Sequence, residues 1–196
     1  MALSIHFYRF LYGSVPKERY RLIDRIDLFY SGIHKMGKVT KLHWINLDRS
    51  LQLIPSSLVL DPVKSFAGAD SVSYNLVSQF MDLATIDEEG RHVRFGCMPI
   101  LGEITKILLN LALMEFDRQL CNQYPGIQFE RFIGQVVIAS TDDLIFDEYK
   151  GIDLATGLGL CCDIESIGPG DEPIECYHRK VALDNEGMVL VINPKD

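Results

Sequence analysis

The longest apolar segment of this chain, residues 100–121, constrains its fold more than any other feature. A helix over this segment has apolar side chains on almost every side, and its few polar positions share one narrow stripe. That stripe contains Glu103, Lys106, Asn110 and Asp117. A membrane-spanning helix needs about 20 largely uncharged residues, so the segment does not resemble one. Residues 99–121 therefore predict a buried helix at the centre of the core.

Two further helices are expected earlier in the chain. Pro16 suits the first turn of a helix, because its missing N–H would have no partner there, and apolar residues then recur at helical spacing as far as the stop at Gly32. Residues 16–31 thus predict one helix. Asp70 can cap a second helix over residues 71–84, because its carboxylate accepts from free N–H groups. The expected apolar face of that helix contains Val72, Leu76, Phe80 and Leu83.

Most of the remaining segments favour β-structure, because they are rich in branched and aromatic residues with partial alternation. The expected strands are residues 3–11, a broken pattern over 38–68, 91–97, a buried strand over 132–140 with a bulge at Gly134, 144–146, 157–164, and a hairpin of 175–183 with 188–192. The fold class predicted is α+β, with a mixed or mainly antiparallel sheet, a strand-rich C-terminal third and about three helices. We expect one domain over residues 1–196, with a sub-region seam near 122–126.

Charge is distributed unevenly along the 196 residues. The chain has 19 Lys and Arg against 27 Asp and Glu, a formal charge of −8. Residues 1–125 hold 14 basic and 13 acidic residues, whereas residues 126–196 hold 5 and 14. All of the net acidity therefore lies in the last third. This distribution argues against direct nucleic-acid binding through a general basic surface.

The densest group of carboxylates surrounds a short apolar segment in that acidic third. It contains Asp142, Asp143, Asp147, Glu148 and Asp153. Such a group can be a solvated loop, a cation site, an acid–base pair or a surface that attracts a basic protein. No calcium-loop spacing is present in the sequence. Among the functional alternatives we favour recognition of a basic partner, which needs no catalytic geometry.

The cysteines indicate a reducing compartment. Their number is odd and their spacing is irregular, which is typical of free thiols in the cytoplasm, and the N-terminus has no signal-peptide pattern. They are Cys97, Cys121, Cys161, Cys162 and Cys176. Adjacent cysteines of a strand point to opposite faces, so only one of Cys161 and Cys162 can join Cys176 and His178, too few to close a structural zinc site. Any cysteine can still pair with a histidine as a nucleophile.

These observations lead to a functional hypothesis. We expect a non-catalytic cytoplasmic protein, with no cofactor, metal or membrane contact, whose acidic surface binds a basic protein through residues 142–153. An immunity or inhibitor protein that neutralises a toxin or nuclease is the most concrete member of this class. The alternative is a small hydrolase or transferase that uses the clustered carboxylates or a Cys–His pair. The sequence contains no Gly-x-Ser-x-Gly, His-Glu-x-x-His or phosphate-loop motif.

Overall fold

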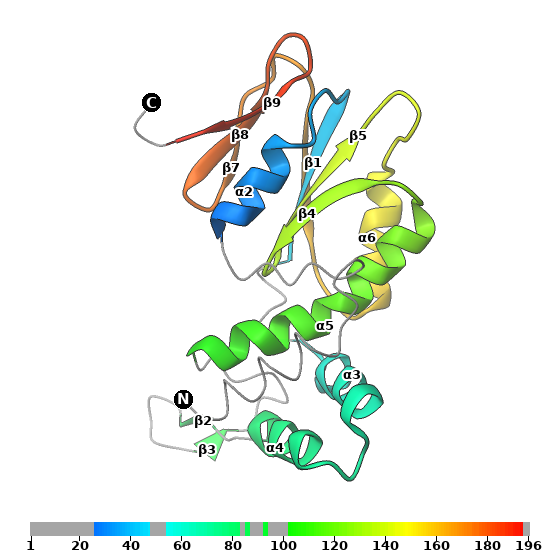
Figure 1. Ribbon diagram of the computed structural model, residues 1–196, viewed down its shortest axis with the longest axis vertical. Helices are drawn as coiled ribbons and strands as arrows, with labels where there is room; N and C mark the ends of the chain where they lie inside the picture. The colour runs from blue at the N-terminus through cyan, green and yellow to red at the C-terminus, as the bar shows by residue number, and fades with distance from the viewer. Residues whose placement is uncertain (1–25, 48–53, 83–84, 87–91, 94–101, 194–196) are drawn as a thin grey trace.

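A four-stranded antiparallel sheet lies in the upper half of the molecule as drawn in Figure 1, above helix α5 (Gly102–Gln123). The computed structural model describes residues 26–47, 54–82, 85–86, 92–93 and 102–193. In order across the sheet, the strands are β4 (Gln128–Phe132), β5 (Gln135–Ser140), β1 (Lys41–Asn46) and β6 (Asp163–Ile167). All three pairings are antiparallel. The predicted α+β class with a mainly antiparallel sheet is confirmed.

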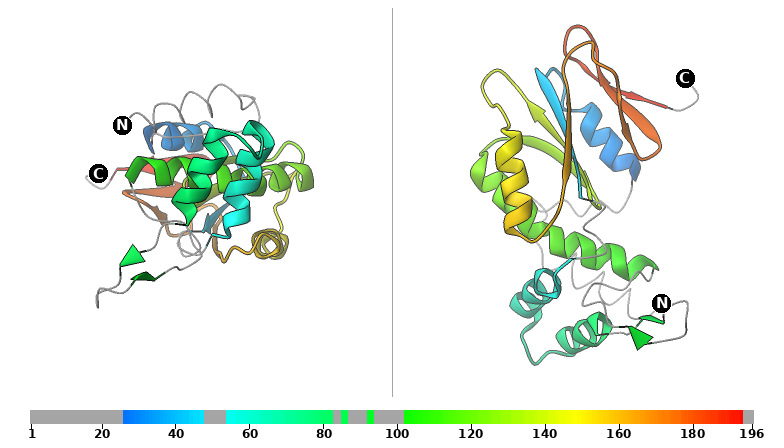
Figure 2. Two further views of the ribbon diagram at one scale, coloured as in Figure 1. Left: turned by 90° about the horizontal axis from the view of Figure 1, so that it is seen from below. Right: turned by 180° about the vertical axis from the view of Figure 1, so that it is seen from behind.

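Both faces of this sheet are covered, which explains why all six residues of β5 are buried. The helices α5 (Gly102–Gln123) and α6 (Glu148–Gly157) lie on one face, where Ile45, Val136 and Ile138 join their core. Helix α2 (Ile26–His34) and a second sheet lie on the other face, with Val137 and Ala139 in a separate core (Figure 2). Residues of β5 therefore alternate between two hydrophobic cores.

The second sheet is an antiparallel meander of β7 (Ile174–Cys176), β8 (Arg179–Leu183) and β9 (Val189–Ile192). The predicted C-terminal hairpin is confirmed for β8 and β9, but the arm expected over residues 175–183 is two strands, β7 and β8, separated by a turn at Tyr177 and His178. Asp184 shapes its turn, because its Oδ1 accepts hydrogen bonds from the backbone N–H groups of Glu186 and Met188 at 2.9 and 2.8 Å. Gly187 has a φ of +83°, and its carbonyl accepts the backbone N–H of Val39 at 2.8 Å. A Cβ on Gly187 would collide with the backbone oxygen of Val39.

Helices α3 (Ser56–Ala67) and α4 (Val72–Met81) pack together, and α3 also contacts α5. The short strands β2 (Thr85–Ile86) and β3 (His92–Val93) pair nearby. The broken strand pattern predicted over residues 38–68 is correct for β1 but wrong for α3. Val59 and Val63 stand at the i,i+4 spacing of a helix and are fully buried. Pro62 lies inside α3, although proline usually interrupts a helix.

The expected start and buried face of α4 also need correction. The N-cap is Ser71, not Asp70, because the Ser71 hydroxyl accepts from the backbone N–H of Tyr74 at 3.1 Å. Val77 and Met81 are the buried residues, whereas Val72 is 75% exposed. The helix begins one residue later than predicted and its core-facing side is rotated.

Helix α2 continues past the predicted stop at Gly32 and ends at His34. The side chain of Glu130 occupies the space that a Cβ on Gly32 would need. Gly32 is therefore a close-packing position inside the helix rather than its terminator. The predicted strand over residues 3–11 and the first part of the predicted helix, residues 16–25, lie outside the described residues, as do residues 94–97 of the predicted strand over 91–97.

Three predictions in the last third are wrong. Gly134 is no bulge within one strand, because Ile133 and Gly134 form the turn between β4 and β5. Residues 144–146 are not a strand but lead into α6, which the sequence pattern missed. Of the strand expected over residues 157–164, only the end is β-structure, since β6 begins at Asp163.

Helix α5 occupies the central position that its sequence predicts. It forms much of one hydrophobic core, and two of its polar side chains, Asn110 and Asp117, are buried. Arg131 from β4 satisfies both: it donates to the Asp117 carboxylate at 2.7 and 2.8 Å and to Asn110 Oδ1 at 2.9 Å. Arg131 also donates to the carbonyl of Ile133 at 3.1 Å, which ties the β4–β5 turn to the helix. Among the described helices, none is long and apolar enough to cross a membrane.

Candidate functional site

The acidic residues singled out in the sequence lie on and before helix α6. Asp142 and Asp143 are exposed in the loop between β5 and α6, and Asp153 is exposed on the helix. Asp147 is the N-cap of α6 and its Oδ1 accepts from the backbone N–H groups of Tyr149 and Lys150 at 3.0 and 3.4 Å. Four of the five carboxylates are therefore exposed along one connected stretch of chain.

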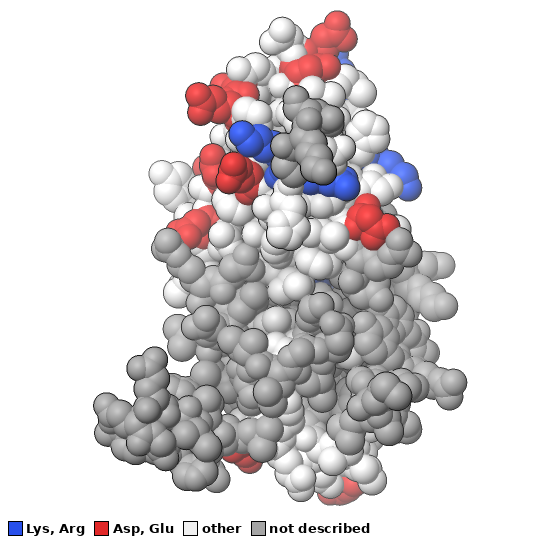
Figure 3. Space-filling model, turned by 90° about the vertical axis from the view of Figure 1, so that its left-hand side faces the viewer, with Lys and Arg blue, Asp and Glu red and all other residues white. Residues whose placement is uncertain are grey.

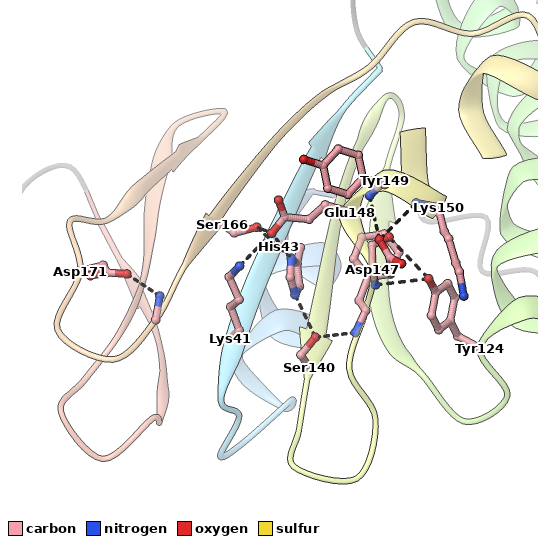
Figure 4. Close-up of polar contacts among 12 residues, drawn as sticks. Lys41, His43, Tyr124, Ser140, Asp147, Glu148, Tyr149, Lys150, Ser166 and Asp171 are labelled. Carbon is pink, nitrogen blue, oxygen red and sulfur yellow. Dashed lines mark hydrogen bonds and ion pairs between the residues drawn. The ribbon is translucent and has the colours of Figure 1, made fainter. Parts of the chain in front are cut away.

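Glu148, the fifth carboxylate, is directed toward the sheet (Figure 4). Its Oε1 accepts hydrogen bonds from Lys41 Nζ at 2.8 Å and from the Ser166 hydroxyl at 2.7 Å. The same oxygen lies 3.3 Å from Nδ1 of His43. Glu148 therefore joins α6 to β1 and β6, and its charge is matched by Lys41.

His43 occupies the centre of this cluster and is 1% exposed. Its Nδ1 is 2.8 Å from Ser166 Oγ and its Nε2 is 2.8 Å from Ser140 Oγ. Ser166 uses its hydrogen toward Glu148, so it must accept from Nδ1–H of the imidazole; Nε2 of the neutral ring then accepts from Ser140. Ser140 in turn accepts the backbone N–H of Phe146 at 2.9 Å. A continuous series of hydrogen bonds thus leads from the Phe146 N–H through Ser140, His43 and Ser166 to Glu148.

The electrostatics of the cluster favour a neutral histidine and an ionised glutamate. Burial and, to a smaller extent, the nearby charge of Lys41 together lower the pKa of His43 to about 4, against the opposing effect of Glu148. Hydrogen bonds from Lys41 and then Ser166 lower the pKa of Glu148 to about 2. At neutral pH the pair is therefore held together by hydrogen bonds to a neutral ring, not by an ion pair between His43 and Glu148.

Ser140, His43 and Glu148 are the residue types of a hydrolase triad. A substrate, however, cannot reach the Ser140 hydroxyl. A nucleophilic serine must reach a substrate carbonyl, and the base must take its proton. Ser140 is 2% exposed and its oxygen already accepts the N–H of Phe146. The Phe146 ring also packs against the imidazole, with centroids 5.1 Å apart. This geometry makes the cluster a structural connection between the sheet and α6.

The thiols and histidines do not form a metal site in the described part of the chain. There, no group of three or more His, Cys, Asp or Glu side chains has the arrangement of a metal site. Cys176 is buried and its thiol donates to Gln135 Oε1 at 3.1 Å, while Cys161 and His178 are exposed. Burial raises the pKa of the Cys162 thiol, which opposes the thiolate that nucleophilic chemistry needs. Cys97 lies outside the described residues.

The surface formed by α2 and the β7–β9 sheet carries both signs of charge. Red and blue side chains alternate over the upper part of this face in Figure 3. Arg179, for example, lies over the ring of Tyr30, with its guanidinium carbon 4.4 Å from the ring centroid. The acidic side chains of residues 126–196 therefore do not make this face uniformly negative, because basic side chains lie among them.

Comparison with known proteins shows a likeness of fold only. No family model and no curated protein matches the sequence. Among solved structures, the chain is similar to an apo telomerase from Candida tropicalis truncated from its C-terminal domain, with a TM-score of 0.55 and 10% sequence identity. The match covers 97% of this chain and 44% of that one. The chain thus spans less than half of the telomerase structure, and at this identity the likeness concerns architecture alone.

Sequence reasoning missed the residues that connect α6 to the sheet. His43, Ser140 and Ser166 are far apart in the chain and share no motif; they meet because β1 pairs with both β5 and β6. One signal was present, namely a histidine within the broken strand pattern over residues 38–68. Such a histidine requires buried hydrogen-bond partners, but only strand order decides which residues provide them.

Proposed function

We propose that this chain is a non-catalytic cytoplasmic binding protein whose acidic surface around α6 engages a basic protein partner. The observation that carries the proposal is the exposure of Asp142, Asp143, Asp147 and Asp153 along one continuous stretch. Carboxylates placed in this way steer a positively charged partner toward the surface and set its orientation. An inhibitor of a toxin or nuclease fits this class, because a nuclease has a positive cleft for nucleic acid.

The geometry also separates two roles among the five predicted contact residues. Glu148 is bound by Lys41 and Ser166, so its charge is already used within the protein. The other four carboxylates are exposed, and Asp147 uses one oxygen as a helix cap. The proposed contact set is therefore Asp142, Asp143, Asp147 and Asp153, with Glu148 in a supporting position.

A charge-neutralised variant tests this proposal. Asp→Asn at the four contact positions removes four charges and retains the cap at Asp147, because asparagine caps helices about as well as aspartate. We expect this variant to lose at least tenfold in affinity for a synthetic Lys/Ser peptide at about 50 mM salt, and to lose most of the salt dependence of binding. Glu172→Gln with Glu175→Gln, exposed acids elsewhere in the same third, is the control.

The natural partner provides the decisive measurement. A basic protein that co-purifies from source cells with the native chain, but not with the four-position variant, would support the proposal. Equal capture by the native chain and the four-position variant, together with equal peptide affinity at every salt concentration, would rule it out.

The likeness to telomerase favours one second candidate, a nucleotidyl transferase that acts on nucleic acid. Telomerase by its name acts on telomeres, and polymerases use two metal ions held close together by carboxylates. Asp163 begins β6 opposite Asn46, the last residue of β1. Asp48, two positions after Asn46 in the sequence, lies outside the described residues. This candidate differs from the sequence-based alternative, which used the carboxylates of residues 142–153 or a Cys–His pair.

Primer extension tests the second candidate directly. The chain is incubated with a primed RNA or DNA template, nucleotides and Mg²⁺ or Mn²⁺, beside Asp48→Asn and Asp163→Asn. A nucleotidyl transferase extends the primer and loses that activity in the variants. Absence of both extension and primer–template binding by the native chain would reject it.

A further inference from the structure

The outward side of α6 and the loop before it expose large apolar side chains. In the described part of the chain seven large hydrophobic residues are exposed, and three of them fall within residues 145–152. Tyr149 is 82% exposed, Ile145 is 73% exposed and Ile152 is 40% exposed. The local concentration, rather than any single residue, is unusual, since isolated exposed apolar side chains are common on protein surfaces.

The packing of α6 explains why these side chains face outward. Gly151, Leu154 and Ala155 are the buried residues of the helix and define its inner side. At 100° per residue, Tyr149 and Asp153 lie on the opposite side, and Ile152 lies on the flank of the helix next to Tyr149. Tyr149 leaves the first turn of α6 next to Glu148, which is held by Lys41 and Ser166 (Figure 4). The sheet and α5 thus leave this side of α6 uncovered.

Exposed carboxylates stand next to the apolar side chains in the sequence. Asp142 and Asp143 precede Ile145 in the same exposed loop, and Asp153 follows Ile152 directly. Lys150 is the single basic residue in the sequence from 142 to 153. An apolar centre with an acidic rim is complementary to a partner with apolar side chains flanked by Lys or Arg.

We infer that this side of α6 binds a basic amphipathic helix of the partner protein. The inference rests on the proposed function and deepens it by naming the chemical form of the contact. Tyr149 is the central contact, because tyrosine buries a large area with little loss of conformational freedom. Ile145 and Ile152 enlarge the apolar area, and the partner's basic residues reach Asp142, Asp143 and Asp153. Helix against helix is the geometry that i,i+3 and i,i+4 side chains of α6 favour.

Two synthetic peptides separate the apolar contact from charge attraction. One is a helix of about 18 residues with Leu at i, i+3, i+4 and i+7 and Lys elsewhere. The other has Ser at the Leu positions and the same charge. The protein variants are Tyr149→Ala and Ile145→Ser, with Val72→Ala on α4, another highly exposed apolar position, as the control. Binding is measured by titration calorimetry or fluorescence anisotropy.

The inference predicts that the Leu/Lys peptide binds at least tenfold more tightly than the Ser/Lys peptide. Tyr149→Ala should remove most of this difference and leave Ser/Lys binding unchanged, while Val72→Ala changes neither. Equal affinity of native protein and Tyr149→Ala for the Leu/Lys peptide would overturn the inference. If the Ser/Lys peptide still binds through the four aspartates in that case, the proposed function stands; if neither peptide binds, both fail. Circular dichroism confirms that each variant keeps its fold.

Discussion

The imidazole Nε2 of His43 lies 2.8 Å from the hydroxyl oxygen of Ser140, and both side chains are buried between β1, β5 and the start of α6. The other ring nitrogen reaches Glu148 through Ser166. Helix α6, which carries the acidic residues, is therefore attached to the sheet by a chain of hydrogen bonds with a neutral histidine at its centre. Stability and surface presentation of α6 depend on the same few atoms.

Acid should weaken this attachment before most carboxylates titrate. The pKa of His43 is about 4 in the folded protein against an ordinary value of 6.5 for histidine, so below pH 6.5 the unfolded chain binds a proton that the folded chain does not. Above pH 6.5 the neutral His43 causes no loss of stability. As the pH drops from 6.5 to 4, the free energy of unfolding should fall by roughly 3 kcal/mol. Urea unfolding across this range measures the loss. His43→Asn should flatten it, and an unchanged slope in that variant would contradict the assignment.

Replacing Ser140 should destabilise the protein more than replacing Ser166. Ser140→Ala leaves the buried N–H of Phe146 and Nε2 of His43 without their partner, at a cost of about 2–4 kcal/mol in unfolding free energy. Ser166 is only partly buried, so water can replace its hydroxyl and Ser166→Ala should cost about 1 kcal/mol or less. Denaturant titrations of the two variants decide this. Similar losses would show that the cluster is more accessible than its burial indicates.

The buried ion pair of Arg131 and Asp117 should be sensitive to removal of one partner. Arg131→Met leaves an uncompensated carboxylate inside the protein and should cost about 3–5 kcal/mol. Arg131→Met combined with Asp117→Leu should recover much of that loss, because no buried charge remains. Arg118→Met, which removes an exposed pair with Glu115, is the control and should cost less than about 1 kcal/mol. Thermal or urea unfolding of all three gives the comparison.

Two glycines of α6 should respond in opposite directions to alanine. A Cβ on Gly151 would lie 2.5 Å from Cζ of Phe146 and 3.2 Å from Cδ1 of Ile164, so Gly151→Ala should destabilise by about 1–3 kcal/mol. A Cβ on Gly157 meets nothing within 4 Å, and Gly157→Ala should be neutral or stabilise by up to about 1 kcal/mol. Unfolding midpoints test the pair, and equal effects would be inconsistent with the packing of Phe146 on α6.

How much of this fold was predictable depended on whether the signal was local. The central helix α5 and the β8–β9 hairpin were predicted because apolar periodicity and turn residues are properties of short segments. Helix α3 was missed because Pro62 suggested an interruption, although Val59 and Val63 have helical spacing. Helix α6 was missed because Gly151 and Gly157 lower helix propensity. The packing of Phe146 requires a small residue at 151, which no local rule indicates.

The candidate site was likewise predictable only where its features are local in the sequence. The position of the acidic residues in the chain was visible in the sequence, because charge is a property of composition. The separation of Glu148 from its exposed neighbours was not, since it depends on Lys41 and Ser166, which are distant in the sequence. Apolar periodicity, turn chemistry and charge distribution were thus determined by the sequence itself. Only the tertiary structure decided which polar groups meet and which side of α6 stays uncovered, because both follow from strand order and from packing between segments far apart in the chain.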